Sequence, residues 1–416
     1  MSPRTRLTPE QAAREILSAV GVLDAESVPL PAALGRVLAA PIVAPFDLPR
    51  WDNAAMDGYA VRSEDLPVAG TTLAVVEEIA AGRFPERALG PDECARIFTG
   101  APIPRGADGV IRQEDATRLD ARTVRIEDLR DAGRNVRRSG EDIAEGARVL
   151  EPGAELGPAQ IGVLASLACA AVEVHRRPRV AILGTGDEIA TLDERDEIIA
   201  GTKIASSNSY TMAAMAARAG AEVVDLGIAR DDPEALRERL ALAADADLIV
   251  TSGGMSVGEH DYLRALLQGT DAALLFWRLR MRPGAPVGFG RYGGVPWIGL
   301  PGNPVSTMVT FELFVRPAIR KLSGHRRLFR RSTPVRLAEP VSTNAPLRHF
   351  LRVKVESEGG TLVARLTGPQ GSGILSSMAK ADALLVVPED RQRVDAGETL
   401  PAILLDEPVH VTEPPY

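Results

Sequence analysis

The chain has 416 residues, of which 45% are hydrophobic and 25% charged, and its formal net charge is −8. This length exceeds one ordinary hydrophobic core and predicts roughly two to four domains of a globular protein. The negative charge argues against a nucleic-acid partner, because no basic stripe is available to neutralise phosphates.

The cysteines and the apolar runs predict a cytoplasmic protein without membrane contact. Cys94 and Cys169 lie far apart and show no CxxC spacing, so neither a disulfide framework nor a zinc site is expected. The amino terminus lacks the apolar core of a signal peptide. The longest apolar run, residues 161–172, is shorter than the roughly 18 residues that span a bilayer.

The first predicted element is a helix that starts after Thr8. Thr8 can cap it, Pro9 suits its first position, and Gln11 completes a capping box. From about residue 51 to 144 short β-rich runs alternate with glycine and proline, which predicts an inserted β domain. Its flanks, residues 1–50 and 145–177, are expected to pair with each other as an elongated N-terminal domain.

Strands and helices then alternate from residue 178 to about residue 327. This order predicts a central α/β domain with a doubly wound parallel sheet. Strand-like runs return over residues 331–412 and predict a C-terminal β domain, which we expect to resemble a barrel. The fold class is therefore multidomain, α/β plus β.

Ligands of open parallel sheets bind beyond the carboxyl ends of the strands, so the loops there are candidate site segments. Backbone N–H groups in such loops can hold phosphate, and their carboxylates can hold Mg²⁺. Asp231, Asp232 and Glu234 alone would be read as charges that complement a helix dipole. The candidate loops are "GTGDE" (184–188), "RDDP" (230–233), "SGGMSVGEHDY" (252–262) and "GLPGNP" (299–304).

The last of these loops combines two prolines and two glycines between an apolar strand and a helix. Proline fixes φ and glycine permits otherwise forbidden angles, so the loop has one shape, and the free N–H groups of the helix start suit an anion. An ordinary tight turn is the alternative. Residues 254–258 also match the G-x-S-x-G nucleophile elbow, but no later histidine lies in a suitable loop.

Nine segments, in order and over nearly the whole chain, resemble the molybdopterin molybdenumtransferase family, which includes the E domain of gephyrin. They are "DNAAMDGYAVR", "FTGAPIPRGAD", "LGTGDE", "SSNSY", "GIARDDP", "TSGGMSVGEHDY", "MRPGAPVGFG", "GLPGNPVS" and "QGSGILSSMA".

The resemblance implies an enzyme of molybdenum cofactor biosynthesis. Such an enzyme inserts molybdate into adenylylated molybdopterin with Mg²⁺-dependent release of AMP. The resemblance also implies a homodimer whose active cleft lies between the α/β domain of one subunit and β regions of its partner. The upstream molybdopterin adenylyltransferase is a further expected partner.

Functional residues are carried over where the motifs match. The expected catalytic residues are Asp57, Thr99, Glu188, Asp231 and Asp261, with Glu188 and Asp261 as Mg²⁺ ligands. Molybdate is expected at Arg282, Arg352 and Ser372. The substrate is expected at Gly184, Thr185, Gly186, Ser252, Gly253, Gly254, Ser256, Pro301, Gly302, Asn303 and Pro304.

One motif departs from the family pattern. Where the family typically has KPGKP, this chain reads Arg282-Pro283-Gly284-Ala285-Pro286. Arg282 keeps a cation that can bind an oxyanion through two hydrogen bonds, whereas Ala285 removes a second cation. Arg278 or Arg280 is a candidate replacement.

Two other functions stay open at this point. The α/β domain alone would also suit a nucleotide-pyrophosphate hydrolase, which would need neither molybdate nor a dithiolene. A non-catalytic dimeric scaffold is the other alternative, and the acids Glu188, Asp231 and Asp261 argue against it.

Overall fold

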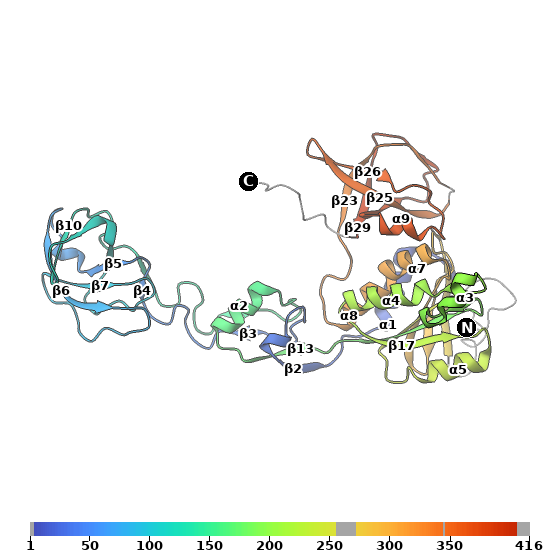
Figure 1. The fold of residues 1–416 in the computed structure, drawn as a ribbon, viewed down its shortest axis with the longest axis horizontal. Helices are drawn as coiled ribbons and strands as arrows, with labels where there is room; N and C mark the ends of the chain where they lie inside the picture. The colour runs from blue at the N-terminus through green and yellow to red at the C-terminus, as the bar shows by residue number, and fades with distance from the viewer. Residues whose placement is uncertain (1–3, 255–271, 344–345, 406–416) are drawn as a thin grey trace.

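The computed structural model describes residues 4–254, 272–343 and 346–405. The molecule is elongated (Figure 1). A β domain lies at one end, a thin connecting part follows, and an α/β part packs beside a C-terminal β part at the other end. The multidomain α/β plus β class predicted from the sequence is confirmed.

The β domain is a six-stranded sheet in the order β8-β5-β7-β6-β10-β9. Side chains alternate along its strands between two separate apolar clusters, so that Ala60 and Val110 face one cluster while Tyr59 and Ile111 face the other. The strands are β5 (Gly58–Val61), β6 (Thr72–Ile79), β7 (Glu93–Ile97), β8 (Gly109–Arg112), β9 (Ala116–Arg118) and β10 (Thr123–Ile126).

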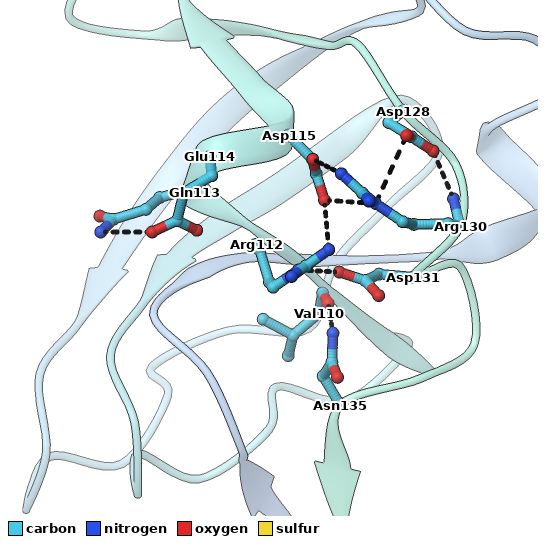
Figure 2. A network of polar contacts seen from close by, with 9 residues as sticks. All are labelled: Val110, Arg112, Gln113, Glu114, Asp115, Asp128, Arg130, Asp131 and Asn135. Atoms are coloured by element: carbon cyan, nitrogen blue, oxygen red, sulfur yellow. Dashed lines mark hydrogen bonds and ion pairs between the residues drawn. The ribbon is translucent and has the colours of Figure 1, made fainter.

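An ion-pair network fastens the loop after β10 to the end of β8 (Figure 2). Asp115 is buried and accepts hydrogen bonds from Arg112 Nη2 at 3.0 Å and Arg130 Nε at 3.1 Å. Arg112 Nε also donates to Asp131 at 2.8 Å. The hydrogen bond from Arg130 is the main reason why the pKa of Asp115 is lowered, so this carboxylate stays charged at neutral pH.

The connecting part is built from chain segments on both sides of the β domain. β2 (Ala25–Pro29) pairs antiparallel with β13 (Ala171–His175), and β3 (Ile42–Val43) pairs with β12 (Arg148–Leu150). Helix α2 (Pro158–Ser166) covers them through Leu164. The β domain is therefore an insertion held at both of its ends.

The α/β part is a seven-stranded sheet in the order β1-β19-β21-β22-β18-β14-β17. The sheet is mixed, not wholly parallel as predicted. The strands from β22 to β17 are parallel and β1 is parallel to β19, but β21 is antiparallel to both of its neighbours. Gly293 and Gly294, both at positive φ, form a two-residue hairpin turn that reverses the chain. The strands are β1 (Arg4–Leu7), β14 (Arg179–Thr185), β17 (Glu222–Ala229), β18 (Leu248–Ser252), β19 (Ala272–Leu279), β21 (Gly288–Tyr292) and β22 (Val295–Leu300).

Helices cover both faces of this sheet. Val180 and Ile182 of β14 face α1, α4, α7 and α8, whereas Ala181 and Leu183 face α5. The predicted capping box is confirmed, since Thr8 Oγ1 accepts from Gln11 N at 3.3 Å and Gln11 Oε1 accepts from Thr8 N at 2.9 Å. The helices are α1 (Pro9–Ala19), α4 (Ser207–Arg218), α5 (Pro233–Ala241), α7 (Pro304–Thr310) and α8 (Arg316–Leu322), with a π turn (Phe311–Val315) between the last two.

The C-terminal β part is a closed barrel of five strands in the cyclic order β25-β26-β23-β29-β27. β20 (Met281–Arg282) of the α/β part pairs in parallel with β25 and ties the two parts together. Phe350 and Leu384, on the outer side of the barrel, pack into the helix-covered core of the α/β part. The barrel strands are β23 (Ser332–Leu337), β25 (Arg348–Glu358), β26 (Thr361–Leu366), β27 (Ala383–Val387) and β29 (Thr399–Leu404).

Over the described residues, no helix combines the length and the apolar character that crossing a membrane requires.

Candidate active site

A cavity of about 670 Å³ lies where the parallel strands end. The loops after β14, β17, β18 and β22 surround it, which is the expected place for a ligand in such a sheet. Two predicted residues, Ser256 and Asp261, lie outside the described residues. The predicted residues that line the cavity are Gly184, Thr185, Gly186, Glu188, Asp231, Ser252, Gly253, Gly254, Pro301, Gly302, Asn303 and Pro304.

The start of α4 adds a wall that the sequence reasoning did not assign to the site. Ser206, Ser207 and Asn208 line the cavity. Asn208 Nδ2 donates to Ser252 Oγ and to the carbonyl of Gly302, both at 2.7 Å, and so joins three loops. The "SSNSY" segment was one of the nine matching motifs, and its position just before a helix was the signal that pointed here.

The stiff loop after β22 is held by hydrogen bonds to its own carbonyl groups. Pro301 O accepts from Thr307 Oγ1 at 2.6 Å and from Ser252 Oγ at 3.2 Å. The expectation that the N–H groups of the helix start are free for an anion is wrong for Val305, whose N–H donates to Ser372 O at 3.0 Å. The loop thus also anchors the segment that follows β26.

Two carboxylates from the described residues face the larger cavity. Glu188 is exposed and Asp231 is partly exposed. Asp232 instead caps α5, since its Oδ2 accepts from Ala235 N at 2.8 Å. Carboxylate oxygens are the ligands that Mg²⁺ uses, so the donor chemistry fits. The described residues contain no cluster of three such side chains, and Asp261, the other predicted ligand, lies outside them.

A second cavity, of about 290 Å³, lies between the α/β part and the barrel. Arg282 and Arg352 line it, as predicted for an anion site, but Ser372 does not. Ser342, Thr343, His349 and Gln370 line it as well, and the sequence reasoning missed them. They come from strand ends and a loop far apart in the chain, so only the closing of the barrel brings them together.

Arg352 is fully buried and carries an unused donor. Its Nε donates to Ser377 Oγ and its Nη2 to Gly371 O, both at 3.0 Å, whereas Nη1 has no partner within the described residues. Burial lowers the pKa of this guanidinium. A buried N–H group without an acceptor is costly, and an anion would satisfy it.

The loop 282–286 separates the two cavities. Pro283 lines the smaller cavity and Pro286 the larger one. Gly284, at φ +98°, packs so closely that a Cβ atom there would lie 2.4 Å from Thr310 Cγ2. Neither Arg278 nor Arg280, the candidate replacements for the cation absent at Ala285, lines either cavity.

Asp57 and Thr99 lie together but far from both cavities. Asp57 Oδ1 accepts from Thr99 N at 2.8 Å and from Thr99 Oγ1 at 2.6 Å, and these bonds lower the pKa of Asp57. Both residues belong to the β domain, at the opposite end of the molecule from the α/β part (Figure 1). Within one chain, therefore, they do not join the other predicted residues.

Three family models match consecutive stretches of the chain. They describe the MoeA N-terminal region (domain I and II) over residues 7–168, a probable molybdopterin binding domain over residues 181–321, and the MoeA C-terminal region (domain IV) over residues 334–405. Together the three models span most of the chain and follow the order of its parts.

Similar proteins carry consistent names. Molybdopterin molybdenumtransferase 2 of Mycobacterium tuberculosis is 39% identical over 90% of this chain and 93% of its own length. The molybdopterin molybdenumtransferase of Haemophilus influenzae is 36% identical over 95% and 97%. A molybdopterin biosynthesis MoeA protein of Pyrococcus horikoshii has a solved structure that aligns with a TM-score of 0.81, at 31% identity, over 97% of this chain and 100% of that one. The chain belongs to the molybdopterin molybdenumtransferase family, whose enzymes act in molybdenum cofactor biosynthesis.

Proposed function

We propose that this cytoplasmic transferase inserts molybdate into adenylylated molybdopterin and releases AMP in a Mg²⁺-dependent reaction. The observation that carries the proposal is the pair of cavities on the two sides of loop 282–286. The larger one fits a phosphorylated substrate, and the smaller one offers guanidinium groups for a tetrahedral oxyanion.

Each cavity has a distinct part in this proposal. The backbone and hydroxyl groups after β14, β18 and β22 hold the substrate phosphates and its pterin end. Glu188 and Asp231, with Asp261 from outside the described residues, are the acids that would hold Mg²⁺. A bound Mg²⁺ supplies charge neutralisation at the phosphate oxygens. Arg282 and the free Nη1 of Arg352 position molybdate beside the substrate across a five-residue loop.

The proposal includes a homodimer in which the partner subunit supplies a β domain to each cleft. Asp57 and Thr99 would complete the site only from a second copy, because in one chain they lie at the far end of the molecule. Light scattering should report about twice the 44.3 kDa of one chain, and a mass of one chain across micromolar concentrations would contradict the dimer.

Mixing two impaired variants, assayed at a Mg²⁺ concentration too low for Glu188→Gln, tests the shared cleft directly. A heterodimer of Asp57→Asn and Glu188→Gln subunits has one doubly altered cleft and one intact cleft if each cleft uses both chains. Refolding the two variants together should therefore restore a sizeable part of the activity that each lacks alone. No recovery, with heterodimers shown to form, would mean that each cleft is built from one chain.

The reaction itself is tested by AMP release from adenylylated molybdopterin. We expect release only when both Mg²⁺ and molybdate are present. Release without molybdate would instead indicate a nucleotide-pyrophosphate hydrolase. No release under any condition, together with a stable dimer, would favour a binding scaffold.

A further inference from the structure

We propose that His349 is a third oxyanion-binding group of the smaller cavity and that it takes up a proton when the anion binds. This inference rests on the proposed function, because it concerns the same anion cavity. It assigns a role to a residue that none of the matching motifs contains, and it names a group that offsets the cation absent at Ala285.

The strand pairing places His349 beside Arg282. In the parallel pair β20–β25 the Cα partner of Arg282 is His349, and paired residues of neighbouring strands point to the same side of a sheet. Both side chains line the smaller cavity. His349 is only 4% exposed, whereas Arg282 is exposed. A small anion that contacts Arg282 in this cavity therefore lies beside the imidazole ring of His349.

The hydrogen bonding of His349 decides which ring nitrogen faces an anion. Nδ1 lies 2.9 Å from the carbonyl oxygen of Leu347, and a carbonyl can only accept, so Nδ1 carries the hydrogen. Nε2 has no partner among the described residues and is not one of the fully buried unpaired atoms, so it is the ring nitrogen available to an anion in the cavity that His349 lines. In the neutral ring this nitrogen presents a lone pair, and only in the protonated ring does it donate.

The charges around His349 favour the neutral ring while the cavity holds no anion. Burial lowers the pKa of His349 most, and the neighbouring charge of Arg282 on β20 lowers it further, against the hydrogen bond to Leu347 O. On its own strand, β25, Arg352 adds a positive charge to the cavity wall. Arg348 lies next to His349 along the strand and is paired with Glu10 of α1 and, at 2.9 Å, with Glu389 beyond β27.

Apart from Arg282 and Arg352, the described residues that line the cavity with His349 are uncharged. The partner of His349 on β27 is Val387. Ser342 and Thr343, at the end of β24 (Val341–Ser342), and Gln370 in the loop after β26 complete the polar wall. No carboxylate from the described residues lines this cavity. A dianion would therefore be the group that compensates a protonated His349.

Anion binding and proton uptake are then linked. A dianion beside the ring favours the imidazolium form and raises the pKa of His349, so the bound state holds one more proton than the free state. The affinity for molybdate should rise as the pH falls, by up to about tenfold per pH unit where uptake is complete. Without His349 the affinity should be nearly independent of pH between about pH 7 and pH 8.5.

Calorimetric titration of the purified full-length protein with molybdate alone measures this linkage. Repeating the titration in two buffers of different ionisation enthalpy gives the number of protons taken up. For wild type we expect uptake that approaches one proton per molybdate bound near pH 7, where the free ring is neutral, and that declines as the pH rises past the pKa of the ring in the bound state. His349→Gln places a permanent amide near the Nε2 position, and His349→Asn keeps a donor near Nδ1 while it removes Nε2.

Both variants should lose the proton uptake and the pH dependence. We expect His349→Asn to bind molybdate about tenfold more weakly than wild type does at pH 7. His349→Gln should lose less affinity than His349→Asn, because its amide can still donate to the anion. Lys354→Met removes an exposed cation from the same strand and should behave as wild type does.

Three outcomes would overturn the inference. Tight, pH-independent binding by wild type, or proton uptake that is unchanged in His349→Asn, would exclude a titrating His349 while leaving the cavity as an oxyanion site. No molybdate binding by wild type would overturn both the inference and the molybdate site of the proposed function. Because the proton count is measured on wild type, the test does not depend on either variant folding.

Discussion

The two cavities on either side of loop 282–286 differ in charge. Among the residues described, the larger cavity is lined by two carboxylates and no lysine, arginine or histidine. The smaller one is lined by Arg282, Arg352 and His349 and by no carboxylate. A chain of five residues thus separates an acidic compartment from a basic one.

In the proposed function, this separation suits the two cavities to different ligands. Carboxylates repel a free oxyanion and attract a divalent cation, whereas guanidinium groups do the reverse. Molybdate and Mg²⁺ can therefore be held close together without competing for the same donors. The charge difference predicts that substitutions in one cavity change the apparent affinity for its own ligand and leave that of the other unchanged.

Removing the buried guanidinium of Arg352 should weaken molybdate binding more than any other single substitution proposed here. Arg352→Met removes the guanidinium charge and its unused donor Nη1, and it leaves Gly371 O without its partner. We expect the molybdate concentration for half-maximal AMP release to rise by about a hundredfold or more. The measurement is a molybdate titration at fixed substrate, accompanied by a melting temperature.

Lys354→Met is the matched control for this change, because it deletes an exposed cation from the same strand. An unchanged molybdate requirement in Arg352→Met would remove this residue from the oxyanion site.

Arg282, the cation of loop 282–286, should contribute less to molybdate affinity than Arg352 does, because Arg282 is exposed. Arg282→Ala should raise the molybdate requirement by roughly ten- to a hundredfold, which corresponds to about 1.5–3 kcal/mol, and should leave binding of adenylylated molybdopterin nearly intact. Ala285→Lys should act in the opposite direction. Arg280→Ala is the control, since Arg280 lines neither cavity. If all of these proteins half-saturate at the same molybdate concentration, the loop does not bind the oxyanion.

A substitution in the acidic cavity should change the Mg²⁺ requirement of AMP release and leave its molybdate requirement unchanged. Glu188→Gln removes one carboxylate charge from its wall and should raise the Mg²⁺ concentration for half-maximal AMP release by about tenfold. Asp193→Asn removes a nearby exposed acid that does not line the cavity, and it should leave the Mg²⁺ requirement unchanged. A changed molybdate requirement in Glu188→Gln would contradict the separation of the two cavities.

His325, whose side chain is mostly buried, allows an effect of pH on stability to be separated from an effect of pH on anion binding. Burial, and then the charge of Arg320, lowers the pKa of His325 to about 4. In the unfolded chain His325 becomes protonated near pH 6.5, whereas in the folded chain it stays neutral until the pH approaches 4. The neutral His325 therefore does not reduce stability above pH 6.5, and stability is lost as the pH falls from 6.5 toward 4.

The expected loss from His325 between pH 7 and pH 5 is on the order of 1 kcal/mol. Urea unfolding of wild type and His325→Gln at both pH values checks it, and the variant should show a smaller difference between them. The pH dependence of molybdate affinity should be the same in both proteins, since His325 lies outside the smaller cavity.

Local sequence patterns predicted much of the fold. Thr8 and Gln11 formed the expected capping box, and the predicted alternation after residue 178 matched β14, α4, β17, α5 and β18 in order, without the short elements between β14 and α4. The antiparallel β21 was missed, because its reversal depends on the Gly293–Gly294 turn and its length on pairing with β19. Periodicity along one strand carries no information about the direction of its neighbour.

The sequence by itself determined the loops of the larger cavity, because each follows a parallel strand and all such loops meet at one edge of the sheet. It could not determine the smaller cavity. His349, Thr343 and Gln370 converge there only because the barrel closes through the β25–β27 pairing and β20 crosses over to join β25. Contacts between residues so distant in the chain depend on how complete domains pack, and local patterns do not encode that packing.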